Sequence, residues 1–356
     1  IFACLYVFYI LVKAMIHRQE GAKIVFCGFA IMFATVINDI LSVNNIIHTI
    51  QLSSFGVFSF ILLQSLISFN KLAKTYKKIE DLSHNLEIKV NMRTKELEQE
   101  KELLHARNRT IENELMIARK IQLQIIPKQS PMEYIHAFYK PMDKVGGDFY
   151  DFLKYRNPDK IGIFLSDVSG HGVPAAFITS MVKTSILQAG ADREDPANLL
   201  SRLNELLLNQ TGGNFVTAFY GIYNPATREF IFSNSGHNPP FIFSSGTVKT
   251  LTGKKSMALA IMNNEELALY NKACSNTAVI LEKGSKLLFY TDGLTETVSA
   301  NNRNWYFEHS LVNGLLNKYS GNSTKDFISN IYRELVEFHG SDSFEDDICM
   351  ICMEVE

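Results

Sequence analysis

The feature that most constrains this sequence is a long apolar N-terminal segment with almost no charge. No Asp, Glu, Lys or Arg occurs from Ile40 to Asn70, and Asp39 is the one such residue between Lys23 and Ile40. A run of about 20 apolar residues is enough to cross the hydrocarbon core of a bilayer as a helix. The sequence therefore predicts three transmembrane helices within residues 1–69, with a buried helical hairpin of a soluble core as the alternative. The three hydrophobic stretches are Ile1–Ile16, Ile24–Val43 and Ile46–Phe69.

Basic residues set the expected orientation of these helices. Three of them flank the first loop, several lysines follow Phe69, and the loop around Asn44 has none. Because loops rich in Lys and Arg stay on the cytoplasmic side, everything after Phe69 is expected in the cytoplasm. Asp39 would then lie near the outer interface, where we expect it to be hydrated. Since the chain begins at Ile1, without Met and inside an apolar run, we expect it to be the C-terminal part of a longer protein.

The next segment, residues 70–126, predicts a coiled coil. It is highly charged and contains no Pro or Gly between Lys71 and Ile126. A heptad register with position a at Leu72 and position d at Tyr76 makes most a and d residues apolar, which is typical of paired helices. We therefore expect a homodimer formed through this segment, with a single solvated helix as the alternative. The net charge of −2 gives no indication of nucleic-acid binding.

Residues 127–356 have the composition of a globular domain, and several of their predicted strands end at an acidic residue. An apolar strand from Ile161 leads into Asp167 and a Gly-rich turn, and a second from Lys286 leads into Asp292 and Gly293. The pair Asp346-Asp347 precedes a last apolar strand, and Asp148 follows Gly146-Gly147. Carboxylates at strand ends, without accompanying Cys or His pairs, make an oxygen-only site that suits Mg²⁺ or Mn²⁺. Solvated turns are the alternative.

The other elements expected in this domain are strands and helices in mixed order, which predicts an α+β fold. The expected helices are Pro174–Ala189, Pro196–Asn209, Tyr306–Lys318 and Thr324–Phe338, and the expected strands include Phe215–Tyr223, Glu229–Ser233 and Pro240–Phe243. In the last strand, Cys349 and Cys352 are three residues apart and therefore point to opposite faces, so we interpret them as packing residues.

These motifs together resemble the SpoIIE/RsbU-type branch of the PPM metal-dependent serine/threonine phosphatases. The resemblance covers roughly Ile117 to the end of the chain. It implies an αββα sandwich, placed after the transmembrane helices and the coiled-coil connector. It is carried by Gly-Gly-Asp148-Phe-Tyr, Asp167-Val-Ser-Gly-His-Gly-Val-Pro-Ala-Ala, Ser-Gly-His237-Asn-Pro-Pro, Tyr-Thr-Asp292-Gly-Leu-Thr-Glu296 and Asp346-Asp347. The three apolar stretches resemble the end of a seven-helix, DISM-type receptor module.

The resemblance also implies the chemistry of the site. Two Mn²⁺ or Mg²⁺ ions would activate a water, with Asp167 bridging both ions and the Val168 carbonyl helping one. Asp292 and Asp346 would hold the second ion, and Asp148 would bind directly or through water. Asp347 is the alternative to Asp346. The implied substrate is a phosphoserine or phosphothreonine on an anti-sigma-factor antagonist or a similar regulator, and the implied location is the bacterial cytoplasmic membrane.

Other interpretations use the same layout. Ser83-His84 resembles a phosphoacceptor box, which favours a sensor histidine kinase, but the rest of that motif is missing. Gly146-Gly147-Asp148-Phe resembles the signature of a diguanylate cyclase, yet it follows the connector by only about twenty residues. Structural roles are expected for His171 and for His237 in its turn, with catalysis as the alternative for both.

Overall fold

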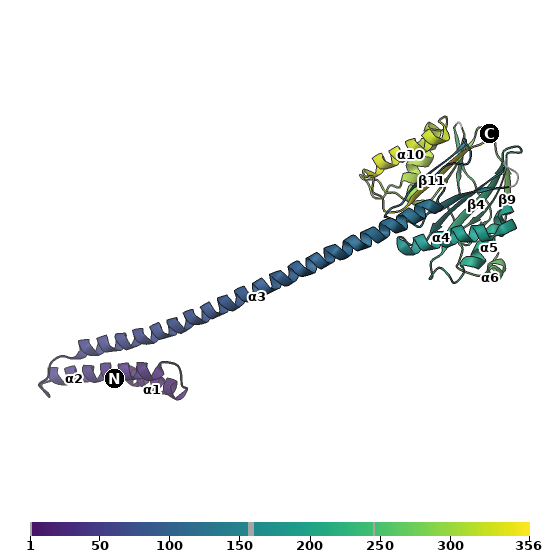
Figure 1. Cartoon of the computed structure of the whole chain (residues 1–356). Helices are drawn as coiled ribbons and strands as arrows, with labels where there is room; N and C mark the ends of the chain where they lie inside the picture. Colours follow the sequence, from purple (N-terminus) through teal and green to yellow (C-terminus); the bar gives the residue numbers. More distant parts are fainter. Residues whose placement is uncertain (1, 156–159, 245) are drawn as a thin grey trace. The chain divides into compact units, whose positions relative to one another are not determined.

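The structure is a computed structural model that describes residues 2–155, 160–244 and 246–356. It divides into two compact units, one up to Ala106 and one from Arg107 to Glu356. The helix α3 (Ser53–Ile125) contributes to both units and has no break at Asn70, where the change in composition predicts a boundary (Figure 1).

The first unit consists of helices. It contains α1 (Phe2–Ile16), α2 (Ala22–Val43) and the N-terminal part of α3. Within the described residues, α2 and α3 are long and apolar enough to cross a membrane, judged by length and composition, and α1 contributes a shorter apolar stretch. Apolar side chains such as those of Ile40, Phe58 and Phe69 are exposed on these helices.

The third helix begins later than the sequence predicted. Residues 46–52 are not helical, and α3 starts at Ser53. Asp39 explains the start, because its carboxylate accepts hydrogen bonds from the backbone N–H groups of Leu52 (2.7 Å) and Ser53 (2.8 Å). These N–H groups have no partner within the helix. The expectation of a simply hydrated Asp39 is therefore wrong, since this residue caps α3.

The second unit contains two β-sheets within its described residues. The first has the strand order β1 (Ile135–Lys140), β11 (Ile348–Glu354), β10 (Lys286–Tyr290), β6 (Phe241–Ser244) and β7 (Thr247–Thr250). The second has β2 (Phe149–Lys154), β3 (Ile161–Val168), β4 (Val216–Asn224), β5 (Glu229–Ser235) and β8 (Lys255–Ser256), and β9 (Thr277–Ile280) also pairs with β5.

Helices cover the outer faces of both sheets, which confirms the predicted α+β sandwich. The second sheet is covered by α4 (Val173–Gln188) and α5 (Pro196–Leu207), shown in teal, and α10 (Thr324–His339), in yellow, covers the first (Figure 1). Shorter helical pieces are η1 (Gly190–Glu194), α6 (Asn264–Leu269), α7 (Asp292–Thr295), α8 (Phe307–Ser310), η2 (Leu311–Leu315) and α9 (Leu316–Lys318). The helix expected over Tyr306–Lys318 thus contains a π-helical turn, η2.

The side chains of strand β11 contribute to two hydrophobic cores, one on each face of the strand. Cys349 packs in the core that includes the space between the sheets, and Cys352 packs under α10. Successive side chains of a strand point to opposite faces, so β11 is buried on both sides and reads as a continuous apolar run. The interpretation of both cysteines as packing residues agrees with this burial.

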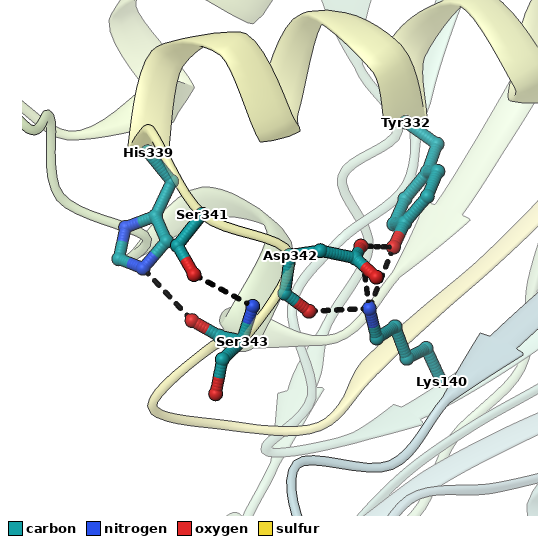
Figure 2. A network of polar contacts seen from close by, with 6 residues as sticks. All are labelled: Lys140, Tyr332, His339, Ser341, Asp342 and Ser343. Carbon is teal, nitrogen blue, oxygen red and sulfur yellow. Dashed lines mark hydrogen bonds and ion pairs between the residues drawn. The ribbon is translucent and has the colours of Figure 1, made fainter.

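A polar network holds the loop after α10 against β1. Lys140 forms an ion pair with Asp342 (2.6 Å) and donates a hydrogen bond to the Tyr332 hydroxyl (2.8 Å), as Figure 2 shows. His339 contacts the Ser343 carbonyl on the same loop. The network fixes the segment that runs from α10 toward Asp346-Asp347.

Candidate functional site

The register of the second sheet places two acidic residues side by side. β3 is buried except at the half-buried Asp167, and it ends in Asp167-Val168. Its neighbour β2 begins at Phe149, which pairs with Ser166 in an antiparallel register. One further step in this register sets Asp148 opposite Asp167. The sequence therefore brings these two carboxylates together through strand pairing.

The first sheet delivers the other acidic residues at one end of an antiparallel pair. Tyr290 at the end of β10 pairs with Met350 in β11. Thr291 continues the pairing, since its N–H donates to the Cys349 carbonyl (3.1 Å). Asp292, which follows β10, and Asp346-Asp347, which precede β11, therefore lie at the same end of this strand pair.

Thr291 links the two sheets at this end of the β10–β11 pair. Its hydroxyl donates a hydrogen bond to Asp148 Oδ2 (2.5 Å) and accepts one from the backbone N–H of Cys349 (3.0 Å). Thr291 is fully buried, and Asp148 is 1 % exposed. A buried hydroxyl with both contacts satisfied orients its acceptor strongly, so Thr291 determines which way the Asp148 carboxylate points.

Asp347 has a different role, because it holds the loop that precedes Asp148. Its carboxylate accepts hydrogen bonds from the backbone N–H groups of Met142 (2.7 Å), Gly147 (2.5 Å) and Asp148 (3.2 Å). The contact requires glycine, since a Cβ on Gly146 would lie 2.1 Å from Asp347 Oδ2. The Val168 carbonyl also approaches this loop, at 2.8 Å from an ideal Cβ on Gly147.

Asp346, by contrast, is exposed, and its Oδ1 accepts the N–H of Asp347 (2.8 Å). It lines a cavity of about 230 Å³ together with Glu296, Glu345 and His339. Of the Asp346-Asp347 pair, Asp346 is thus the carboxylate that faces solvent beside the acidic cluster, whereas Asp347 is engaged with the backbone.

The acidic side chains are close enough to perturb one another's ionisation. Burial, together with the charges of Asp292, Asp346 and Asp347, raises the pKa of Asp167 to about 8. Burial, together with Asp167 and Asp347, raises the pKa of Asp148 well above its usual range. The pKa values of Asp292 and Asp346 are also raised, first by burial and then by neighbouring carboxylates. Carboxylates arranged in this way are costly unless a cation or protons neutralise them.

The donor set fits a hard divalent cation, because carboxylate and carbonyl oxygens are its preferred ligands. Among the described residues, however, no three Asp, Glu, His or Cys side chains are arranged to hold one metal ion in common. In this structure Asp148 Oδ2 accepts a hydrogen bond from Thr291, and Asp347 Oδ2 accepts one from the backbone N–H of Gly147.

The two remaining motif residues, His171 and His237, lie in different surroundings. His171 is exposed between Gly170 (φ 89°) and Gly172 (φ 78°), in the turn that leads into α4. His237 is buried, its Nδ1 contacts the Thr217 hydroxyl (2.8 Å), and its N–H and carbonyl are both bonded by the Asn234 side chain. These backbone bonds are those expected of a residue that stabilises a turn.

Gln122 is a polar residue at this site that lies outside the motifs, whereas Thr291 belongs to the motif around Asp292. Gln122 lies in the last turns of α3 and bonds the backbone of Gly146. Its burial is the signal that sequence inspection lacks, because a Gln on a charged helix is ordinarily solvated.

Comparisons with known proteins identify the family of this chain. Residues 157–356 match the family described as Stage II sporulation protein E (SpoIIE). The chain is 27 % identical over 282 residues to the phosphoserine phosphatase RsbU of Bacillus subtilis, covering 77 % of this chain and 80 % of that protein. It is 24 % identical over 194 residues to the phosphoserine phosphatase RsbP of the same organism, covering 52 % of this chain but 46 % of RsbP.

Solved structures share the fold. The SiaA-PP2C domain of Pseudomonas aeruginosa superimposes with a TM-score of 0.61 at 22 % identity, covering 70 % of this chain and 98 % of that one. The phosphatase domain and regulatory fragment of SpoIIE from Bacillus subtilis give a TM-score of 0.51 at 16 % identity, covering 62 % and 63 %. The sandwich, its acidic strand ends and the family match lead to one conclusion: the chain belongs to the SpoIIE family of PP2C-type serine/threonine protein phosphatases.

Proposed function

We propose that this chain is a membrane-tethered phosphatase that removes phosphate from phosphoserine or phosphothreonine of a regulatory protein, using two divalent cations, Mn²⁺ or Mg²⁺. The observation that carries the proposal is the cluster of acidic strand ends that strand pairing and the Thr291–Asp148 hydrogen bond bring together. Burial first, and then the neighbouring carboxylates, raise the pKa values of its members. An anionic site of this kind attracts divalent cations. PP2C-type phosphatases are metal-dependent as a family.

In the proposed site each residue has a defined task. Asp167 would bridge the two ions, with the Val168 carbonyl beside it, and Asp292 and Asp346 would hold the second ion. Asp148, whose Oδ2 accepts a hydrogen bond from Thr291, would bind an ion directly or through water, and Asp347 fixes the loop that precedes it. When bound, the cations would supply Lewis-acid stabilisation of the phosphoryl oxygens and a more acidic water.

We further propose that the substrate is a phosphorylated anti-sigma-factor antagonist or a similar small regulator. The support is the similarity to RsbU and RsbP, both named phosphoserine phosphatases. The exposed cavity beside Asp346 is open to a phosphorylated side chain presented on a protein surface.

Residues 1–69 are proposed to anchor the chain as three membrane-spanning helices in the bacterial cytoplasmic membrane, with residues 70–126 as connector and 127–356 as a cytoplasmic catalytic domain. The exposed apolar side chains of the first unit support the anchor, since such a surface is unfavourable in water. Exposed Leu97 and Leu104 on α3 support pairing with a second copy as a coiled coil.

The kinase and cyclase alternatives are less well supported. β1 pairs with β11 and β2 pairs with β3, so the Gly146-Gly147 loop passes between sheets and does not close the hairpin that a cyclase signature requires. For the kinase, His84 lies on the exposed surface of α3, but the residues that follow it lack the rest of the phosphoacceptor motif.

The test is phosphate release from a phosphoserine peptide by the full chain in detergent, with Mn²⁺ and with EDTA. We expect release that requires the metal, that Asp167→Asn reduces at least a hundredfold, and that Asp81→Asn, a change at an exposed carboxylate of α3, leaves unchanged. Release that persists in EDTA, or that survives Asp167→Asn, would contradict the proposal.

A further inference from the structure

The loop that joins α1 to α2 borders a cavity with a mixed lining. The cavity has a volume of about 690 Å³. Two basic side chains, Arg18 and Lys23, line it together with the apolar side chains of Ile16 and Ile24. All four side chains are exposed, that of Ile16 to 74 %. The cavity therefore presents positive charge and apolar surface to the same ligand.

The loop lies beside the point where α3 changes from apolar to basic. Gly21 packs so closely on α3 that a Cβ on this glycine would lie 2.8 Å from Ile67 Cγ2. Further along α3, Lys74 forms an ion pair with Glu20 of the loop. Residues 71–78 contain four lysines and no acidic residue. The cations of the loop and those of α3 are thus gathered at one end of the apolar helices.

The two cations of the cavity have no carboxylate partner in the part of the chain that the structure describes. Glu20 lies between Arg18 and Lys23 in the sequence, but it pairs with Lys74 instead. Arg18 has φ 51°, a left-handed conformation that is uncommon for a residue other than glycine. Its N–H donates to the Met15 carbonyl (3.0 Å), so the guanidinium extends from a hydrogen-bonded turn.

The position of Lys23 adds to this uncompensated charge. Lys23 lies in the first turn of α2, which contains no acidic residue, and Gly21 at the N-cap has no side chain to bond the free N–H groups. Because the helix dipole is positive at this end, a cation here is unfavourable, and an anion beside it relieves the repulsion. The chain itself supplies no such anion among the described residues that line the cavity.

We propose that this cavity binds a phospholipid with an anionic headgroup, whose phosphate lies between Arg18 and Lys23 and whose acyl chains cover Ile16 and Ile24. The inference rests on the proposed membrane anchor, which puts the loop at the cytoplasmic face of the bilayer. Basic residues at that face attract anionic lipids. A free phosphate ion would compensate the charges but leave the apolar side chains in water, whereas acyl chains cover them.

The test is native mass spectrometry of the full chain in detergent, titrated with dioleoylphosphatidylglycerol or with dioleoylphosphatidylcholine. We expect the wild type to bind the anionic lipid at least tenfold more tightly, and the double variant Arg18→Gln with Lys23→Gln to lose this preference. The matched control is Lys77→Gln with Lys78→Gln, which removes the same charge from the exposed basic segment of α3 but outside the cavity. Its affinity for either lipid should change less than twofold.

Two further variants separate the charged part of the site from the apolar part. Arg18→Lys keeps the positive charge and should keep the preference for phosphatidylglycerol. Ile16→Ser removes exposed apolar surface, so it should weaken binding of both lipids by a similar factor and leave the preference between them unchanged. Inorganic phosphate at a hundredfold excess over phosphatidylglycerol should not displace the lipid from the wild type.

Equal affinities of the wild type for the two lipids would overturn the proposal. Equal losses in the two double variants would also overturn it, because they indicate general attraction to a basic surface, and displacement by inorganic phosphate would assign the cavity to a soluble anion. Failure of the proposed anchor appears differently, as a full chain that stays in solution without detergent and does not float with phosphatidylcholine vesicles. Failure of the proposed phosphatase activity would leave the lipid titrations unchanged.

Discussion

The two adjacent acidic residues before β11 should respond in opposite ways to the same change. Asp347→Asn replaces a carboxylate that accepts three backbone N–H groups in a buried setting. The Asn side chain keeps one oxygen as acceptor. Its NH₂ group takes the place of the other carboxylate oxygen and faces the backbone N–H that this oxygen had bonded. Each buried N–H left without a partner costs about 1–3 kcal/mol. Since Oδ2 serves two of the three donors, we expect a loss of about 3 kcal/mol in the free energy of unfolding.

Asp346→Asn should be nearly neutral for stability in the absence of metal. Its carboxylate is exposed and accepts the N–H of the next residue, which an Asn oxygen can also accept. Burial and the charges of Asp292 and Asp347 raise the pKa of Asp346, so removing its charge relieves repulsion. We expect a change within about 1 kcal/mol, toward stabilisation, because a partly exposed charge is strongly screened.

Urea unfolding of the full chain in detergent and EDTA at pH 8 measures both effects. Trp305 is the one tryptophan of the sequence and lies in the second unit, so its fluorescence follows this unit selectively. Equal stabilities for the two variants, or a larger loss for Asp346→Asn, would refute the assignment of Asp347 to the loop and Asp346 to the site.

Three further predictions concern the site, the pH dependence and the connector. Thr291→Val should lower the free energy of unfolding by about 2 kcal/mol, because the Cys349 N–H loses its acceptor and the Asp148 carboxylate its donor; an unchanged urea midpoint would contradict this. Burial lowers the pKa of His237 to about 4, so the unfolded chain takes up a proton near pH 6.5 while the folded chain does not. Stability should therefore fall by roughly 3 kcal/mol between pH 6.5 and 4, and subtracting the profile of a His237→Gln variant isolates this contribution from the carboxylates. If the coiled coil is the dimer interface, Leu97→Glu with Leu104→Glu should abolish dimerisation in light scattering, whereas Leu103→Glu, equally exposed but off the a/d positions, should not.

The acidic strand ends could be predicted because each signal is local. A buried strand followed by Asp and Gly, as at Asp167 and Asp292, indicates both the element and the place where it ends. The antiparallel register then brings the ends together, so the site follows once the strands are paired.

Gln122 could not be found in this way. The heptad that makes Ile121 an a position makes Gln122 a b position, which is ordinarily solvated. Its partner Gly146 is 24 residues away, and only folding of the domain against the helix buries the amide. Asp39 was missed for a similar reason, because the helix N-terminus that it caps begins 14 residues later.

Strands β1, β7 and β9 could also not be predicted from the sequence. β1 has a mixed burial pattern and is defined by pairing with β11, which lies at the other end of the domain. β7 and β9 are four residues each, too short for a period-2 pattern to be distinguished from a loop. Their pairing partners, β6 and β5, determine them.

The most direct test of the metal site is equilibrium binding of Mn²⁺ to the full chain in detergent at pH 8. We expect two ions to bind each chain, with binding weakened at least tenfold by Asp167→Asn and unaffected by Asp81→Asn. A chain that binds no Mn²⁺, or whose binding is indifferent to Asp167, would contradict the claim that the acidic strand ends form a two-metal centre.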